Sequence, residues 1–245
     1  MIKLYKSFFV ENPYKISNRL IVIIFFTPII MFLVLGLLFA IPSTRGFGIW
    51  LVLENNPIEL LTFIIFFLGG IFGIYFTFKI PKQEKKLVVL FYAFFSFCLI
   101  ILAMEEISWG QSFFHFDTPQ AWKEINFQGE TTLHNLNFMQ SIRDNLLLIF
   151  GLSGLFGIFL RNFPKFKKIG VPKVLISWFL MISVQASLDI LVDFVVIYKP
   201  FDNGIERLAE LTELLIAGSA FLYLWMNLRK FIEPLTHIDY YEKYQ

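Results

Sequence analysis

Carboxylates and a histidine gather in one stretch of the chain, between residues 105 and 135. The stretch begins with the adjacent acids Glu105 and Glu106, and Glu130 and His134 lie near its end. Adjacent residues of a helix point about 100° apart, so at most one of the two adjacent acids is expected to face the centre of a bundle. Carboxylates and imidazoles transfer protons near neutral pH, and they also ligate divalent metals. We therefore take Glu106, Glu130 and His134 as candidate catalytic residues.

Polar side chains between these residues are candidates for positioning a substrate. They are Trp109, Gln111, Asn126, Gln128 and Asn135. A purely structural interpretation stays open, because tryptophan commonly anchors a helix at the membrane interface. In that interpretation, the two adjacent acids simply face water.

Further acids recur at helical spacing later in the chain. Gln185, Asp189 and Asp193 follow one another at four-residue steps, which places them on one face of a helix. Glu213 follows Glu210 by three residues on the next helix. Ionisable residues at membrane depth usually face the bundle interior or a wet cavity. The alternative for the first group is a polar stripe bonded to neighbouring helices.

These acids extend the candidate site to a candidate metal centre. Its predicted ligands are Glu106, His134, Asp189, Asp193 and Glu213. A site that includes histidine would suit zinc or manganese, whereas oxygen ligands alone would suit magnesium or calcium. Arg143 and Arg207 are available to neutralise part of the acidic charge.

The composition indicates what positions these groups. Of 245 residues, 57% are hydrophobic and 16% are charged, and 32 are phenylalanine. An average soluble domain is roughly 45–50% apolar and about 25% charged. The composition therefore predicts an integral membrane protein and excludes a disordered chain. Cys98 is the single cysteine, so an intrachain disulfide is excluded as well.

Apolar runs predict an all-α fold with six transmembrane helices. A spanning helix needs about 20 mostly apolar residues, and the first run, Leu20–Pro42, is too long for the apolar part of a signal peptide. The predicted spans are about 20–42, 59–80, 87–108, 141–160, 172–197 and 208–228. They form a single membrane domain over residues 1–245, with a structured extracytoplasmic loop at 109–140 between the third and fourth helices.

Basic residues predict the orientation of these helices. If the N-terminus is cytoplasmic, 16 of the 21 Lys and Arg residues fall on the cytoplasmic side, as the positive-inside rule requires. We therefore predict a multi-pass protein of the cell membrane with both termini in the cytoplasm. On that topology 14 of the 19 acids lie on the outer side. Since acids contribute little to insertion, this asymmetry indicates a functional site or a packed polar cap.

The loop motif resembles a known family. The string EEISWGQ at 105–111, then Thr118-Pro119, then N-x-Q-x-E-x-x-L-H-N at 126–135, is similar to a family of uncharacterised bacterial multi-pass membrane proteins. The resemblance implies membrane location and the importance of these positions, and it carries no established activity. The layout is also similar to the alkaline ceramidases and their superfamily, but a three-histidine zinc site would need an outer histidine beyond His115 and His134.

Three functions remain open at this point. The favoured one is a metal-dependent hydrolase or transferase that acts on a lipid or lipid-linked substrate, since clustered acids and a histidine can activate water. The others are an accessory or assembly subunit that binds a membrane-protein partner, and an ion- or proton-coupled transporter. The bilayer is a partner in each case. The basic runs are typical of positive-inside signals rather than of nucleic-acid sites.

Overall fold

Long helices dominate the computed structural model, which describes residues 14–53, 55–126, 129–194 and 199–232. Within these ranges, six helices are long and apolar enough to cross a membrane, which confirms the predicted six-helix membrane fold. They are α2 (Asn18–Ala40), α4 (Pro57–Lys79), α5 (Lys86–Glu106), α8 (Asn137–Leu160), α9 (Ile176–Phe194) and α10 (Lys199–Ile232). The chain is therefore an integral multi-pass membrane protein. Which side of the membrane each helix end faces stays a prediction.

Two helices begin earlier than the apolar runs predicted. The fourth span was expected from residue 141 and the sixth from residue 208, but α8 begins at Asn137 and α10 at Lys199. The extra turns carry polar residues that line a cavity instead of facing lipid, among them Gln140, Glu206 and Arg207. An apolar window misses such turns because it assumes that every side of the helix meets the bilayer.

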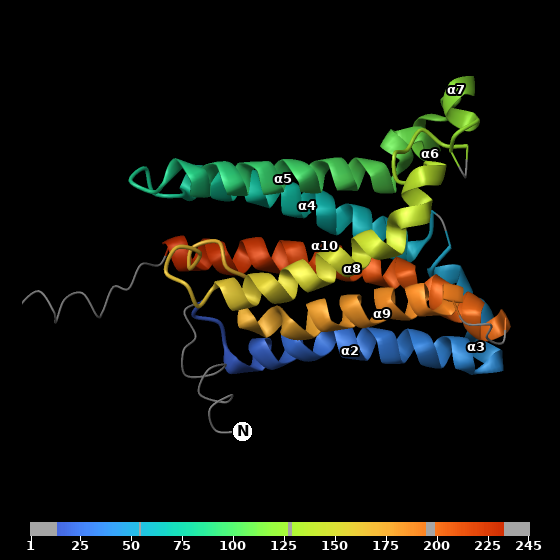
Figure 1. Ribbon diagram of the computed structural model, residues 1–245, viewed down its shortest axis with the longest axis horizontal. Helices are drawn as coiled ribbons and strands as arrows, with labels where there is room; N and C mark the ends of the chain where they lie inside the picture. The colour runs from blue at the N-terminus through green and yellow to red at the C-terminus, as the bar shows by residue number, and fades with distance from the viewer. Residues whose placement is uncertain (1–13, 54, 127–128, 195–198, 233–245) are drawn as a thin grey trace, which may run out of the picture.

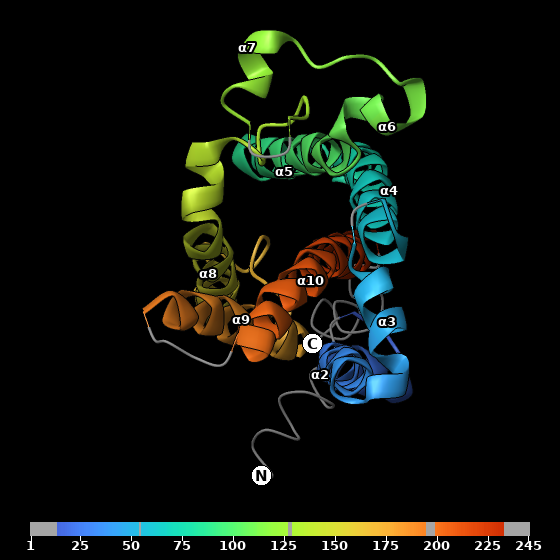
Figure 2. The same cartoon turned by 90° about the vertical axis from the view of Figure 1, so that its right-hand side faces the viewer.

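The helices lie side by side in a bundle with α10 at its centre (Figures 1 and 2). Helix α10 packs against α4 on one side and α9 on the other, while α4 pairs with α5 and α8 pairs with α9. Helix α2 packs on α9, with the short α3 (Pro42–Leu51) folded back against it. Accordingly, α10 has the largest buried share of the six spans.

Glycines allow the close contact between α4, α5 and α10. A Cβ added at Gly73 of α4 would meet Ser96 Oγ of α5 and would lie 2.9 Å from Leu224 Cδ1 of α10. Small residues at such crossings let membrane helices approach closely, which matters because association in lipid depends largely on van der Waals packing. This contact fixes the three helices whose ends carry Glu59, Glu106 and Glu210.

We expect Gly73→Leu to destabilise the bundle by about 1–3 kcal/mol, because the added side chain overpacks the crossing. Thermal unfolding in detergent micelles measures this. Gly36→Leu in α2 is the matched control, since a Cβ there meets nothing within 4 Å. Equal melting temperatures for the two variants would contradict the packing described here.

The connection between α5 and α8 is a structured loop, as predicted. It contains a turn of 3₁₀ helix, η2 (Ser108–Gly110), and the single turns α6 (Gln111–Phe114) and α7 (Gln120–Lys123). Ser108 and Trp109 have φ angles of 48° and 57°, in the left-handed region that non-glycine residues rarely adopt. Such strain costs of order 1–3 kcal/mol per residue, so the surrounding contacts must hold the turn in place.

Candidate functional site

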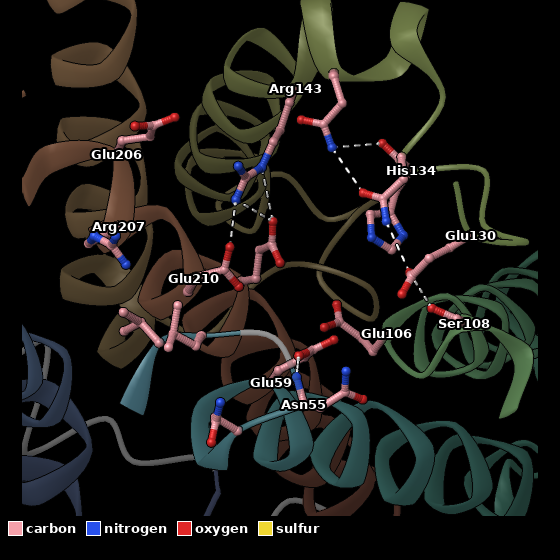
Figure 3. Close-up of a pocket in the computed structure, with 16 residues that line it drawn as sticks. Asn55, Glu59, Glu106, Ser108, Glu130, His134, Arg143, Glu206, Arg207 and Glu210 are labelled. Carbon is pink, nitrogen blue, oxygen red and sulfur yellow. Dashed lines mark hydrogen bonds and ion pairs between the residues drawn. The ribbon is translucent and has the colours of Figure 1, made fainter. Parts of the chain in front are cut away.

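A polar cavity of about 760 Å³ lies at one end of the bundle, where α4, α5, α8, α10 and the loop meet (Figure 3). Most of its ionisable lining residues are acidic, and they come from elements far apart in the sequence. They are Glu59, Glu106, Glu130, His134, Arg143, Glu206, Arg207, Glu210 and Glu213. Five predicted site residues, Glu106, Glu130, His134, Asn135 and Glu213, therefore share one cavity.

A buried carboxylate, Glu105, connects the end of α5 to the loop. Only 6% of its surface is exposed. Its Oε1 accepts a hydrogen bond from Trp109 Nε1 at 2.7 Å, and its Oε2 accepts from the backbone N–H groups of Leu133 at 2.6 Å and His134 at 3.1 Å. These bonds hold Trp109 in its strained turn and fix the segment that carries His134.

The same carboxylate orients the imidazole of His134. Nδ1 of the ring lies 3.4 Å from Glu105 Oε2, and half of the His134 side chain remains exposed. Because Glu105 is an acceptor for three N–H groups, the Nδ1 atom carries the proton in this contact. Nε2 is then the ring nitrogen available to a ligand in the cavity.

The environment of His134 also alters its proton affinity. Burial by the surrounding protein acts to lower the pKa of His134, but the hydrogen bond to Glu105 and the negative charge of Glu213 outweigh it. The net effect raises the pKa of His134 above its ordinary value. Near neutral pH, a larger share of this imidazole is therefore protonated than in a solvent-exposed histidine.

Glu130 and Asn135 line the cavity and are held by the loop. Glu130 Oε2 accepts from Ser108 Oγ at 2.5 Å and from Asn135 Nδ2 at 3.4 Å. Gln140 Nε2 of α8 donates to Asn135 Oδ1 at 3.0 Å, which ties the loop to that helix. By contrast, no ion pair links Glu106 to the other lining residues (Figure 3). A ligand in the cavity would thus not have to displace an ion pair to reach Glu106.

Three predicted positioning residues do not line the cavity and instead hold the loop together. Trp109 donates to Glu105, as described above. Gln111 Nε2 donates to Thr118 Oγ1 at 2.8 Å, and its Oε1 accepts from Thr131 N at 3.0 Å. Asn126 Nδ2 donates to the Thr132 carbonyl at 3.0 Å. Gln128, also predicted as a positioning residue, lies outside the described residues.

An ion-pair network joins α8 to α10 across the cavity wall. Arg143 Nε and Nη2 donate to Glu213 Oε1 at 3.2 and 3.0 Å, and Nη2 also donates to Glu210 Oε1 at 3.3 Å. The expectation that Arg143 neutralises part of the acidic charge is confirmed. Arg143 and Glu210 line the cavity but are not among the predicted site residues, although an arginine just before an apolar run, opposite helical acids, indicates such a pairing.

The acidic stripe of α9 does not reach the cavity through Asp189. Its Oδ2 accepts from Gln185 Nε2 at 3.3 Å, and the same nitrogen donates to the Ile205 carbonyl of α10 at 2.8 Å. This arrangement matches the alternative of a polar stripe bonded to a neighbouring helix. The Asp193 side chain lies outside what the structure describes.

A metal centre is not evident from the arrangement of these groups. Across the described ranges, no three His, Cys, Asp or Glu side chains form a group that could hold a metal ion. The divalent metal predicted from the sequence therefore stays a prediction.

An apolar pocket of about 330 Å³ adjoins the polar cavity. It lies between α5 and α8, and its apolar walls include Leu102 and Leu146. Both spaces are lined by the same four ionisable residues, which are Glu106, His134, Arg143 and Glu213. These four residues stand where a polar environment changes to an apolar one.

Comparison of the chain with protein-family models, with curated proteins and with solved structures finds no match. The family expected from the loop motif thus stays an expectation. The function has to be argued from the site itself.

We expect Glu105→Gln to lower the pKa of His134, because the substitution removes both the charge and the carboxylate acceptor of the ring proton. Titration of the histidine ring signals by NMR in micelles measures the shift, with His115 and His237 replaced by glutamine so that one signal remains. Glu124→Gln, a charge removed elsewhere in the same loop, is the control. An unchanged His134 pKa in Glu105→Gln would contradict the contact.

Proposed function

We propose that this protein is a membrane-embedded hydrolase or transferase that acts on a lipid or lipid-linked substrate. The observation that supports the proposal most strongly is that Glu106, His134, Arg143 and Glu213 line both the polar cavity and the apolar pocket. A molecule with a polar head and an apolar chain would place the junction between the two parts beside these four side chains. Ester bonds of lipids lie at that junction.

Glu106 and His134 supply the acid–base pair that such a reaction needs. In hydrolysis, Glu106 accepts a proton from water as the water oxygen forms a bond to the carbonyl carbon of the substrate ester. The bond from that carbon to the alcohol oxygen then breaks, and protonated His134 donates its Nε2 proton to the leaving oxygen. In a transferase, an acceptor hydroxyl takes the place of water. A raised His134 pKa favours the proton-donor role, since more of the ring is protonated near neutral pH.

The alternative is an accessory subunit that binds another membrane protein. The observation that favours it is an exposed aromatic patch on the loop, where Phe113, Phe114 and Phe116 are 57%, 80% and 40% exposed. Such a patch is suited to a partner or to the membrane interface. An acid–base pair would have no role in this alternative, so variants of Glu106 distinguish the two functions.

We expect Glu106→Gln and His134→Asn each to lower turnover by about 10²–10⁴-fold, because each removes one proton-transfer group. The assay incubates the reconstituted protein with vesicles of phosphatidylethanolamine, phosphatidylglycerol and cardiolipin and follows the lipids by mass spectrometry. Glu124→Gln, an exposed acid of the same loop, should retain full turnover. Intact lipids after incubation with the wild type, or equal turnover in Glu106→Gln, would contradict the proposed activity.

Metal analysis of the same preparations tests the predicted metal. If the predicted metal binds, it should appear in the wild type in equimolar amount and be lost in His134→Ala, because His134 would then be a ligand through Nε2 instead of a proton donor. Metal-free wild-type protein that still turns over lipid would contradict the predicted metal and would show that the acid–base pair is sufficient for turnover.

A further inference from the structure

A seam between α5 and α8 holds two apolar pockets, one beside the polar cavity and one deeper in the bundle. A second pocket of about 330 Å³ lies further along the same two helices, and its walls include Phe91 and Phe95 of α5 and Gly157 of α8. Both pockets are also lined by α10, through Ile216 in the first and Ala220 in the second. The two pockets follow one interhelical seam, with α10 as its floor.

Among the residues that the structure describes, no helix covers this seam. Helix α5 packs on α4 and helix α8 packs on α9, so the two helices that border the seam belong to different pairs. Leu102 of α5 and Leu146 of α8 are 41% and 42% exposed on its walls. Because these residues lie in membrane-spanning helices, the surrounding medium is the hydrocarbon of the bilayer.

The length of the seam suits a lipid chain. From Phe91 to Glu106, α5 rises by about 22 Å at about 1.5 Å per residue. The hydrocarbon core is about 30 Å thick, so a chain that starts at the cavity and follows the seam would reach past the membrane midplane.

The charges of the cavity indicate the headgroup that would accompany the chain. Six carboxylates and two guanidinium groups line the cavity, which favours a ligand with a positive charge. Arg143 is bound to Glu210 and Glu213, whereas no ion pair links Arg207 to the other lining residues (Figure 3). Arg207 is therefore available for one anionic group, such as a phosphate.

We propose that the seam between α5 and α8 holds an acyl chain of an amine-bearing, zwitterionic phospholipid from the surrounding bilayer, whose headgroup lies in the polar cavity. The ammonium faces the carboxylates, the phosphate approaches Arg207, and the chain passes between Leu102 and Leu146. The lipid reaches the cavity sideways from the membrane. This inference names the substrate class of the proposed function and depends on that function for turnover, but not for binding.

Lipid retention tests the seam without any turnover. The full chain is reconstituted in vesicles of equal parts phosphatidylethanolamine and phosphatidylglycerol, extracted in mild detergent, and analysed for bound lipid by native mass spectrometry. We expect about one phosphatidylethanolamine per protein. Leu146→Trp should reduce its retention by roughly tenfold because the indole fills the seam. Leu152→Trp on the same helix is the control, because Leu152 is 51% exposed and lines neither seam pocket.

A second measurement needs no variant. Phosphatidylethanolamine with a photoreactive diazirine in its acyl chain should label Leu102 and Leu146 several-fold more than Leu152. Uniform labelling of the lipid-facing surface, equal loss of lipid in both tryptophan variants, or equal retention of phosphatidylglycerol would overturn the proposal.

The results also separate the seam from the proposed activity. Retained lipid without turnover in the wild type refutes the activity alone. Turnover without labelling of the seam refutes the lipid path alone.

Discussion

The hydrogen bonds of the buried Glu105 carboxylate are the interaction on which the arrangement of the site depends. These bonds stabilise the left-handed turn at Trp109, and they also fix the backbone at Leu133 and His134. The charge-assisted bonds of a buried carboxylate are strong, and a missing partner would leave a costly unsatisfied group. The loop is therefore fixed to α5 at a single point, and the cavity takes its shape from that attachment. Its neighbour Glu106 is left to face the cavity.

A second contact closes the opposite wall. Arg143 of α8 binds Glu210 and Glu213 of α10, so the positive charge of the guanidinium offsets part of the negative charge of the two carboxylates. Glycine contacts hold α4 and α5 against α10 below this level. The α4–α5 pair and the α8–α9 pair both pack against α10, but α5 and α8 leave the seam open between them. The same architecture thus creates a polar cavity at the helix ends and an apolar path that leads into it.

The sequence predicted the helices well, because apolar length alone identifies spans in a bilayer. It also predicted that at most one of the two adjacent acids would face the centre. It named Arg143 and Arg207 as available partners for the acids, and Arg143 makes the ion pairs. The sequence did not show which of the predicted site residues hold the loop together instead of lining the cavity. The contact between Glu105 and His134, for example, joins positions 29 residues apart. Helical spacing correctly placed Asp189 on one face with Gln185. Spacing does not determine what that face packs against, and here it contacts the Ile205 backbone instead of the cavity.

The most direct test of this account is hydrogen–deuterium exchange at the backbone amides of Leu133 and His134 in the wild type and in Glu105→Gln. Both amides donate to the Glu105 carboxylate, so the account predicts slow exchange in the wild type and in Glu106→Gln, and fast exchange in Glu105→Gln. Equally slow exchange in all three proteins would show that the loop holds its shape without the Glu105 carboxylate, and would contradict its role in fixing the loop.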